Sequence, residues 1–249
     1  MRRTRAFTLV ELLLALAITV ILVLLLTSVV AATLGAWRQG RNHLDTYANA
    51  RQVLGRLGDE LKGARANPSV SASQIQFVEN KTLGAVPVPA AASAESIFFV
   101  APYPNLGAGD LCTIAYALDT TTHELKRAFR SSEQVWADGS GKRYQAGGHN
   151  YVAADWHVIA TGVLEFELRC YSQQDLDTSL DPPAASWDSE STDPYMVGQA
   201  PRRIVIRLRV VDDRAATQLA GLTAGSATYN SIVLRSARQF FSEVSLPPP

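Results

Sequence analysis

The sequence predicts an α+β protein in which one long N-terminal helix is followed by an antiparallel, strand-rich domain. Three observations lead to this prediction. An apolar segment of about 30 residues begins at residue 7, and a helical repeat of apolar residues follows it. After residue 68 the hydrophobic period changes from about 3.6 residues to 2. A helix followed by a run of strands is typical of α+β folds, whereas α/β folds alternate the two elements.

The composition of the 249-residue chain excludes several classes of protein. Hydrophobic residues make up 47% and charged residues 18%, so the chain is too apolar to be intrinsically disordered. Two cysteines are too few for a disulfide-based scaffold. The 23 basic and 23 acidic residues balance, and we therefore expect no nucleic-acid partner.

The N-terminal apolar segment is long enough to cross a membrane. Residues 7–36 contain a single charged residue, Glu11, and a helix of about 30 residues reaches roughly 45 Å, beyond the ~30 Å of a hydrocarbon core. Arg2, Arg3 and Arg5 precede the segment, which places the N-terminus in the cytoplasm and the rest of the chain across the membrane. A cleaved secretory signal peptide explains the segment less well, because its apolar core spans only ~7–15 residues.

Glu11 requires a separate explanation. A carboxylate inside a membrane segment costs about 2.5–3.5 kcal/mol on insertion scales, and no basic side chain lies within the segment. An ordinary membrane anchor explains the length and the arginines but not this acid. We therefore expect Glu11 to be neutralised by a group from another molecule.

The residues around Glu11 resemble the leader of type IV prepilins and type II secretion pseudopilins. The string Arg5-Ala6-Phe7-Thr8-Leu9-Val10-Glu11 has their short basic leader and FTLxE motif, and an apolar helix follows. This resemblance covers residues 2–36. It implies that a prepilin peptidase cuts between Ala6 and Phe7 and methylates the new Phe7 amine. It also implies that Glu11 pairs with the Phe7 amine of a neighbouring subunit during assembly. The family usually has Gly before the cut, where this chain has Ala6.

The helix is predicted to continue beyond the membrane as an amphipathic segment over residues 37–67. Apolar residues recur there at spacings of 3 and 4, which places them on one stripe of a helix. The stripe consists of Tyr47, Ala50, Leu54, Leu57, Leu61 and Ala64, and we expect it to pack on a sheet. Asn67-Pro68 is the predicted end of the helix.

Residues 68–249 are predicted to form one antiparallel β-rich domain, because apolar and polar residues alternate as they do in half-buried strands. In the segment at 125–130, for example, Leu125, Arg127 and Phe129 share one face. We expect strands at 75–78, 97–101, 111–118, 125–130, 158–159, 163–171 and 203–211, with a turn at 119–122. A short helix around 213–222 and a last strand within 232–244 complete the prediction.

The sequences of two of these strands indicate which families within the prepilin and pseudopilin group the chain resembles. The segments Gly-Val-Leu-Glu-Phe-Glu-Leu-Arg and Pro-Arg-Arg-Ile-Val-Ile-Arg-Leu-Arg-Val-Val-Asp-Asp look like minor pseudopilin J. The chain is also similar to the Verru_Chthon cassette protein C family. Both resemblances imply a pilin-like fold, in which a long N-terminal helix packs on an antiparallel sheet.

A search for chemical motifs in the sequence gives no reason to expect an enzyme or a cofactor. Gly221 to Gly225 has the outline of a nucleophile elbow, but Thr223 replaces the serine and no strand precedes it. An acidic stretch that includes Asp175, Asp177 and Asp181 is a weak candidate for calcium. A solvated acidic loop is the simpler interpretation, and we expect no metal.

Cys112 and Cys170 both fall on inward-facing positions of predicted strands. In an oxidising compartment they could form a disulfide. They could equally remain two separate small buried side chains. The sequence leaves both interpretations open.

Charged residues on two predicted strands suggest contacts across a sheet. Arg203, Arg207 and Arg209 lie on an exposed face of one strand, and Glu165 and Glu167 lie on an exposed face of another. If these strands are neighbours, cross-strand ion pairs are expected. A docking patch for another subunit is the more ambitious alternative.

These features together predict a structural subunit, a minor pseudopilin of a type II secretion or type IV pilus-like assembly. We expect it to cross the inner membrane once, with a cytoplasmic N-terminus and a periplasmic C-terminal domain. Its expected partners are other pilins or pseudopilins, the prepilin peptidase and the inner membrane. The alternative is a bitopic anchored ectodomain that binds a ligand or catalyses a reaction, and it predicts no cleavage.

Overall fold

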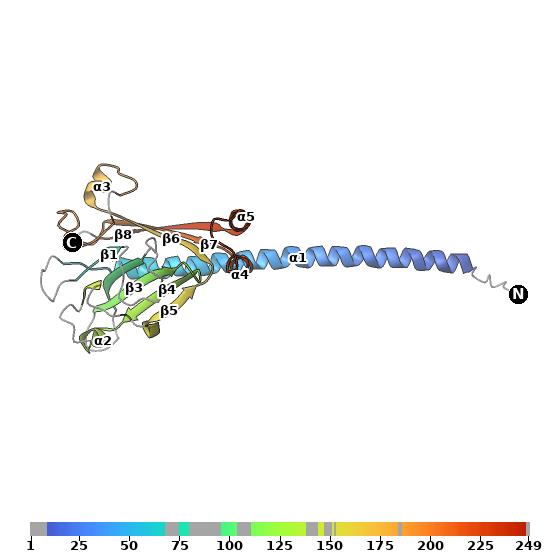
Figure 1. Ribbon diagram of the computed structural model, residues 1–249, viewed down its shortest axis with the longest axis horizontal. Coiled ribbons are helices and arrows are strands. Elements are labelled where there is room, and N and C mark those ends of the chain that lie inside the picture. Colours follow the sequence, from blue (N-terminus) through green and yellow to red (C-terminus); the bar gives the residue numbers. More distant parts are fainter. Residues whose placement is uncertain are drawn as a thin grey trace. The chain divides into compact units, whose positions relative to one another are not determined.

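The computed structural model describes residues 9–67, 75–79, 96–103, 111–137, 144–146, 151, 153–183 and 186–247. The chain divides into two compact units, Met1–Asp45 and Thr46–Pro249. A single helix, α1 (Leu9–Lys62), passes through both units. All of the strands belong to the second unit (Figure 1).

The second part of α1 confirms the predicted apolar stripe. Its buried hydrophobic residues are Ala50, Leu54, Leu57 and Leu61 from the predicted stripe, together with Val53. Tyr47, at the start of the predicted stripe, remains 49% exposed. The helix therefore buries one face, while the opposite face stays in contact with solvent.

The end of α1 lies at Lys62, several residues before the predicted end at Asn67-Pro68. Gly63 and Ala64 donate their N–H groups to the carbonyls three residues earlier, which tightens the last turn. Arg65 then forms an isolated antiparallel bridge with Val100. This bridge leaves the chain extended before it reaches the proline.

The strands form two antiparallel sheets, where the sequence analysis expected one. The five-stranded sheet has the order β1-β2-β3-β4-β5 and the three-stranded sheet has the order β6-β7-β8. The first contains β1 (Val78–Glu79), β2 (Ser96–Pro102), β3 (Leu111–Asp119), β4 (Glu124–Arg130) and β5 (Trp156–Ala160). The second contains β6 (Val163–Tyr171), β7 (Arg203–Val210) and β8 (Arg238–Ser245).

The change from one sheet to the other takes place at Gly162, between β5 and β6. Gly162 has a φ of +69°, and a Cβ atom there would lie 2.6 Å from the Val211 carbonyl oxygen. Val211 donates its N–H to the Gly162 carbonyl over 2.8 Å. Only glycine tolerates both the backbone angle and this close approach. The chain leaves the first sheet at this corner, and β6 pairs with β7.

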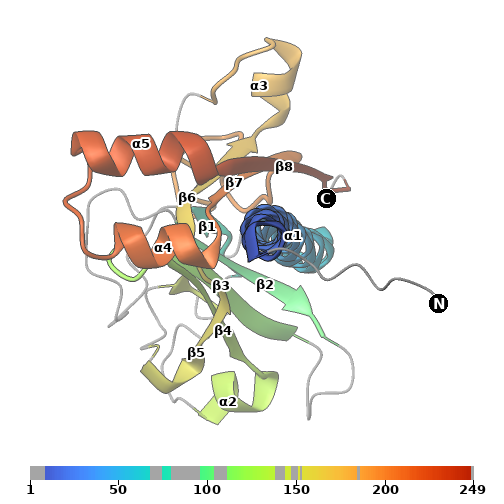
Figure 2. The same ribbon diagram turned by 90° about the vertical axis from the view of Figure 1, so that its right-hand side faces the viewer.

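Five short helical segments complete the fold among the described residues. They are α2 (Ser132–Ala137), the 3-10 turn η2 (Ala153–Asp155), α3 (Gln173–Asp177), α4 (Asp213–Leu219) and α5 (Ala227–Ser236). The helix α5 was not predicted, because residues 232–236 were assigned to the last strand. The Ser226 side chain caps α5 by accepting from the Tyr229 N–H. Helices α4 and α5 lie together beside the three-stranded sheet (Figure 2).

The main core lies between the second part of α1 and the inner faces of the two sheets. Its largest members from the five-stranded sheet are Phe99, Ile114 and Tyr116, and Phe166 and Ile206 contribute from the other sheet. A second cluster, which includes Phe98, Tyr151 and Trp156, covers the opposite face of the five-stranded sheet. That sheet is therefore buried on both faces.

One polar cluster joins α1 to the five-stranded sheet inside this core. The Glu60 carboxylate of α1 accepts from the Tyr116 hydroxyl over 2.6 Å. It also accepts from the Arg127 guanidinium through Nε at 3.2 Å and through Nη2 at 2.8 Å. The Glu60 and Arg127 side chains are each only 8% exposed, so both charges are removed from water and paired.

Aromatic rings surround the Glu60 cluster. The rings of Tyr116 and Phe99 stack with their centroids 6.5 Å apart, and the Arg127 guanidinium lies 5.0 Å from the centre of the Phe129 ring. Burial, followed by the negative charge of Glu60, raises the pKa of the Tyr116 phenol. The hydroxyl therefore stays protonated and remains a donor to Glu60.

Replacing Glu60 with Gln should lower the free energy of unfolding by about 3–5 kcal/mol, because a buried Arg127 loses its counter-charge. Arg56→Gln is the matched control, since Arg56 contacts the same carboxylate at 3.2 Å but is 49% exposed. That change should cost less than about 1 kcal/mol. Urea unfolding of the full chain in detergent, followed by tryptophan fluorescence, measures both variants. Equal losses would contradict a special role for the buried pair.

Candidate functional site

The first part of α1 is the segment of the described chain suited to contact a membrane. Leu9–Trp37 contains 29 residues and is long and apolar enough to span a bilayer. Its large apolar side chains are exposed along the whole segment, between 48% at Leu34 and 76% at Leu9. An apolar surface on every side of a helix requires lipid or other apolar helices around it.

The hydroxyl groups within this segment are satisfied by the helix itself. Thr19, Thr27, Ser28 and Thr33 donate to backbone carbonyls three or four residues earlier, over 2.7–2.8 Å. An unsatisfied hydroxyl would be costly in a medium without water. These side chains therefore leave the outer surface of the helix effectively apolar.

The predicted processing site lies outside the described residues, because the description begins at Leu9. Cleavage between Ala6 and Phe7 therefore remains a prediction. Glu11 is described and lies in the first turn of α1, on the exposed helix surface. Its pairing with the Phe7 amine of another subunit is likewise a prediction.

The far end of the apolar segment carries a pair of side chains that the sequence analysis did not identify. Trp37 is its last residue, and the Arg41 guanidinium, one turn later, lies 5.9 Å from the centre of the Trp37 ring. Attraction between a cation and an aromatic ring accounts for this arrangement. A tryptophan directly after a long apolar run, with arginine at the next turn, is the signal that could have revealed it.

The predicted cross-strand ion pairs are confirmed on the outer face of the three-stranded sheet. Glu165 stands opposite Arg209, and Glu167 stands opposite Arg207, on the paired strands β6 and β7. The Arg209 and Glu165 side chains are 3.8 Å apart, and both are partly exposed. Pairs of this kind contribute little to stability individually.

Arg203, the third predicted member of this face, pairs with the third strand of the sheet. Its Nε atom lies 3.1 Å from the Glu243 carboxylate on β8. Its guanidinium also lies 4.8 Å from the centre of the Tyr171 ring. The charged residues thus connect all three strands across this face, and each arginine has an acidic neighbour.

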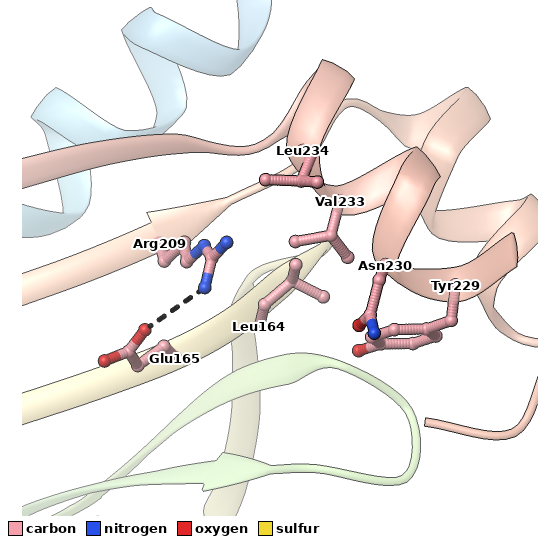
Figure 3. A pocket seen from close by; sticks show the side chains of 7 residues that line it. All are labelled: Leu164, Glu165, Arg209, Tyr229, Asn230, Val233 and Leu234. Carbon is pink, nitrogen blue, oxygen red and sulfur yellow. Dashed lines mark ion pairs between the residues drawn. The ribbon is translucent and has the colours of Figure 1, made fainter. Parts of the chain in front are cut away.

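A groove of about 550 Å³ lies between α5 and the strands β6 and β7. Figure 3 shows Leu164 and Val233 pointing toward each other, with the Glu165–Arg209 ion pair at one end and Tyr229 and Asn230 at the other. Its lining residues are Leu164, Glu165, Arg209, Tyr229, Asn230, Val233 and Leu234. Leu234 is 80% exposed, so the groove is open to solvent.

A second groove, of about 620 Å³, lies between the second part of α1 and β8. The Tyr47 and Phe240 rings meet edge to face there, with centroids 5.1 Å apart. Its lining residues are Tyr47, Ala48, Arg51, Leu54, Gly55, Phe240, Phe241 and Ser242. Neither groove is lined by a histidine or a cysteine among the described residues.

The three aspartates considered for calcium have separate roles in the structure. Asp175 forms a capping box with Ser172 at the start of α3. Asp177 accepts from the Gln173 amide over 2.8 Å, and Asp181 accepts from the Tyr171 hydroxyl over 2.6 Å. Within the described ranges, no three histidine, cysteine or acidic side chains converge on a common metal position. The calcium alternative therefore receives no support from the geometry.

Cys112 and Cys170 are both buried free thiols, and the disulfide considered above is not formed in this structure. Cys112 lies on β3 of the five-stranded sheet, whereas Cys170 lies on β6 of the three-stranded sheet. Burial is the main cause that raises the pKa of the Cys170 thiol well above its usual 9.0. Cys170 therefore stays protonated and can donate a hydrogen bond.

The acceptor for Cys170 is Glu79, a buried carboxyl on β1 that the sequence analysis did not single out. Glu79 is 7% exposed. Its backbone N–H donates to the Trp187 carbonyl, and its carboxylate accepts from the Trp187 backbone N–H. Burial raises the pKa of the Glu79 carboxyl from 4.5 to about 7, although hydrogen bonds from Cys170 and Trp187 oppose the shift. Glu79 thus links an edge of the first sheet to the second sheet.

Comparison with known proteins identifies the N-terminal segment. A family model described as the prokaryotic N-terminal methylation motif matches residues 1–34, a range that includes residues 6, 7 and 11. No curated protein matches the chain. Among solved structures, the chain is similar to a type IV-like pilin from Thermus thermophilus, with 10% identity and a TM-score of 0.42. That similarity covers 81% of this chain and 96% of the pilin chain.

The raised pKa of Glu79 predicts a specific dependence of stability on pH. The folded state binds the Glu79 proton more tightly than the unfolded state does. The contribution of Glu79 to the free energy of unfolding is therefore greatest below pH 4.5 and falls as the pH rises to about 7. Glu79→Gln should remove this fall, which amounts to at most roughly 3 kcal/mol. Urea unfolding at pH 5 and pH 8 measures the difference between variant and wild type. Glu243→Gln, on exposed β8, is the control, and an equal effect from it would refute the assignment.

Proposed function

We propose that this chain, which carries the N-terminal motif of the type IV prepilin and pseudopilin superfamily, is a membrane-anchored subunit that assembles with other pilin-like subunits. The match of the methylation motif to residues 1–34 is the observation that carries the proposal. More narrowly, we assign it as a minor pseudopilin of a type II secretion or type IV pilus-like assembly. The resemblance of its strands to minor pseudopilin J supports this finer assignment.

Maturation under this proposal begins with hydrolysis of the peptide bond between Ala6 and Phe7 by a prepilin peptidase. The cut releases a leader that contains Arg2, Arg3 and Arg5. It also creates an N-terminal amine at Phe7, and methylation of that amine preserves its positive charge. A positive amine and the Glu11 carboxylate are then both present at the start of the apolar helix.

Assembly under this proposal brings the apolar parts of several α1 helices together. Pairing of Glu11 with the Phe7 amine of a neighbour neutralises two charges that would be costly to bury unpaired between packed apolar helices. The exposed apolar surface of Leu9–Trp37 packs against equivalent surfaces, and its hydroxyl groups require nothing from the partner. Glu11 therefore confers specificity, while the apolar surface supplies most of the contact.

The proposed location is the inner membrane, with the leader in the cytoplasm and the two sheets in the periplasm. The three arginines before the apolar segment support this orientation. The proposed partners are other pilins or pseudopilins, the prepilin peptidase and the membrane. We propose no enzymatic activity for this chain.

The alternative function is that of a bitopic anchored ectodomain that binds a ligand. The groove beside α5, with its apolar floor and its ion pair, is the observation that favours this alternative. It requires neither cleavage nor association with pilins. The N-terminal experiments below distinguish the two functions.

Co-expression with a prepilin peptidase should produce a mature chain that begins at N-methylated Phe7. Mass spectrometry of the intact chain and of its N-terminal peptide measures both changes. Ala6→Gly should be processed at least as completely, because glycine is the usual residue at this position, and Ala6→Leu should be processed less. A chain that keeps residues 1–6, or one cut elsewhere, would contradict the proposed processing.

Substitution of Glu11 by Leu should leave membrane insertion intact and abolish incorporation into filaments, because the charge that selects the neighbouring amine is lost. The measurement is the fraction of chain recovered in sheared filaments from cells that carry the native assembly system. Thr19→Leu is the control, since it also replaces a polar side chain of the same helix with an apolar one. Normal incorporation of the Glu11 variant would refute the pairing.

A further inference from the structure

The apolar part of α1 is longer than the membrane it is proposed to cross. Leu9–Trp37 contains 29 residues, which corresponds to roughly 44 Å of helix, whereas a hydrocarbon core is ~30 Å thick. The helix could therefore slide by several residues without bringing a charge into the core at its far end. Hydrophobicity alone therefore does not determine the depth of this helix in the membrane. Side chains at the ends of the segment must determine it.

Cleavage would remove the basic residues from one of those ends. Arg2, Arg3 and Arg5 are the only basic side chains before Arg38 in the sequence, and all three belong to the proposed leader. In the processed chain, the basic side chains nearest to the apolar segment are Arg38 and Arg41 on its far side. Basic side chains that can attract anionic headgroups therefore lie only at the far membrane surface, beyond the C-terminal end of the apolar segment.

Trp37 and Arg41 have the chemistry of a membrane–water boundary. Trp37 is 63% exposed, and the Arg41 guanidinium lies 5.9 Å from the centre of its ring. Tryptophan is enriched at the level of lipid headgroups, and a guanidinium can donate two parallel hydrogen bonds to a phosphate. Leu44, one turn further, is 70% exposed and continues an apolar contact on the same side of the helix.

We propose that Trp37 and Arg41 together bind the headgroups of anionic phospholipids at the far membrane surface. This inference rests on the proposed function, which places α1 across a membrane. The indole lies at the boundary of the hydrocarbon core, and the guanidinium contacts a lipid phosphate directly above it. The pair fixes the depth of the apolar helix in a chain that has lost its leader.

This anchor also determines where Glu11 lies. Glu11 precedes Trp37 by 26 positions, which corresponds to roughly 39 Å along a helix. That distance exceeds the ~30 Å hydrocarbon core. With Trp37 at the far boundary, Glu11 lies in the headgroup region of the cytoplasmic surface, where a carboxylate is far less costly than in the core. Glu11 is then within reach of neighbouring amines.

Quenching by brominated lipids tests the proposal on the full chain in vesicles. The same mole fraction of either brominated phosphatidylglycerol or brominated phosphatidylcholine is included in otherwise identical phosphatidylcholine vesicles. Trp136, Trp156 and Trp187 belong to the other unit of the chain, so the difference between wild type and Trp37→Phe isolates the quenching of Trp37. We expect the brominated anionic lipid to quench Trp37 more than the brominated phosphatidylcholine does, by up to about fivefold. A fivefold preference corresponds to the attraction of about 1 kcal/mol between one basic residue and an anionic surface.

Arg41→Gln should lower this preference toward equality, whereas Arg51→Gln, which removes another exposed arginine of α1, should leave it unchanged. Equal quenching by the two lipids in the wild type, or a preference that survives in Arg41→Gln, would overturn the inference and leave the proposed function intact. Absence of quenching by both lipids would place Trp37 away from the membrane and would overturn both.

Discussion

The contact of Glu60 with Tyr116 and Arg127 is the interaction on which the arrangement of the second unit depends. Tyr116 on β3 and Arg127 on β4 stand directly opposite each other in the sheet, so two neighbouring strands present their donors to one carboxylate. Leu57 and Leu61, one turn before and directly after Glu60, are fully buried. A buried carboxylate accepts only donors in the correct place. The cluster therefore fixes the rotation and the axial position of the second part of α1 on the sheet, which apolar packing alone defines less sharply.

A single helix thus serves two environments. Its second part buries one apolar face and belongs to the unit Thr46–Pro249. Its first part is apolar on every side and belongs to the other unit, Met1–Asp45. Such a division suits a subunit that is anchored by one part of a helix and displays a folded domain on the other. The N-terminal motif supports the same interpretation.

The sequence was most informative where the signal is local. The apolar segment, the stripe on α1, the hairpin of β3 and β4 and the charged alternation of β6 and β7 all follow from residue spacing. Alternation also placed Arg127 on the same strand face as Leu125 and Phe129, but it could not supply Glu60 as the partner, because the two residues are 67 positions apart. The division into two sheets depends on the close approach at Gly162, which no local pattern reveals. The helix α5 was missed because Ile232 and Val233 fit a strand as well as a short helix.

Native-state hydrogen exchange of the full chain in detergent tests most directly whether the second part of α1 and the sheets unfold as one unit. If the Glu60 cluster joins the second part of α1 to the sheets, the backbone amides of Leu57 and Leu61 should open with the same free energy as those of β3 and β4. Amides at residues 15–35 should open independently of that group. Exchange of Leu57 and Leu61 at markedly lower free energy than the strands, with the sheets still protected, would contradict the account.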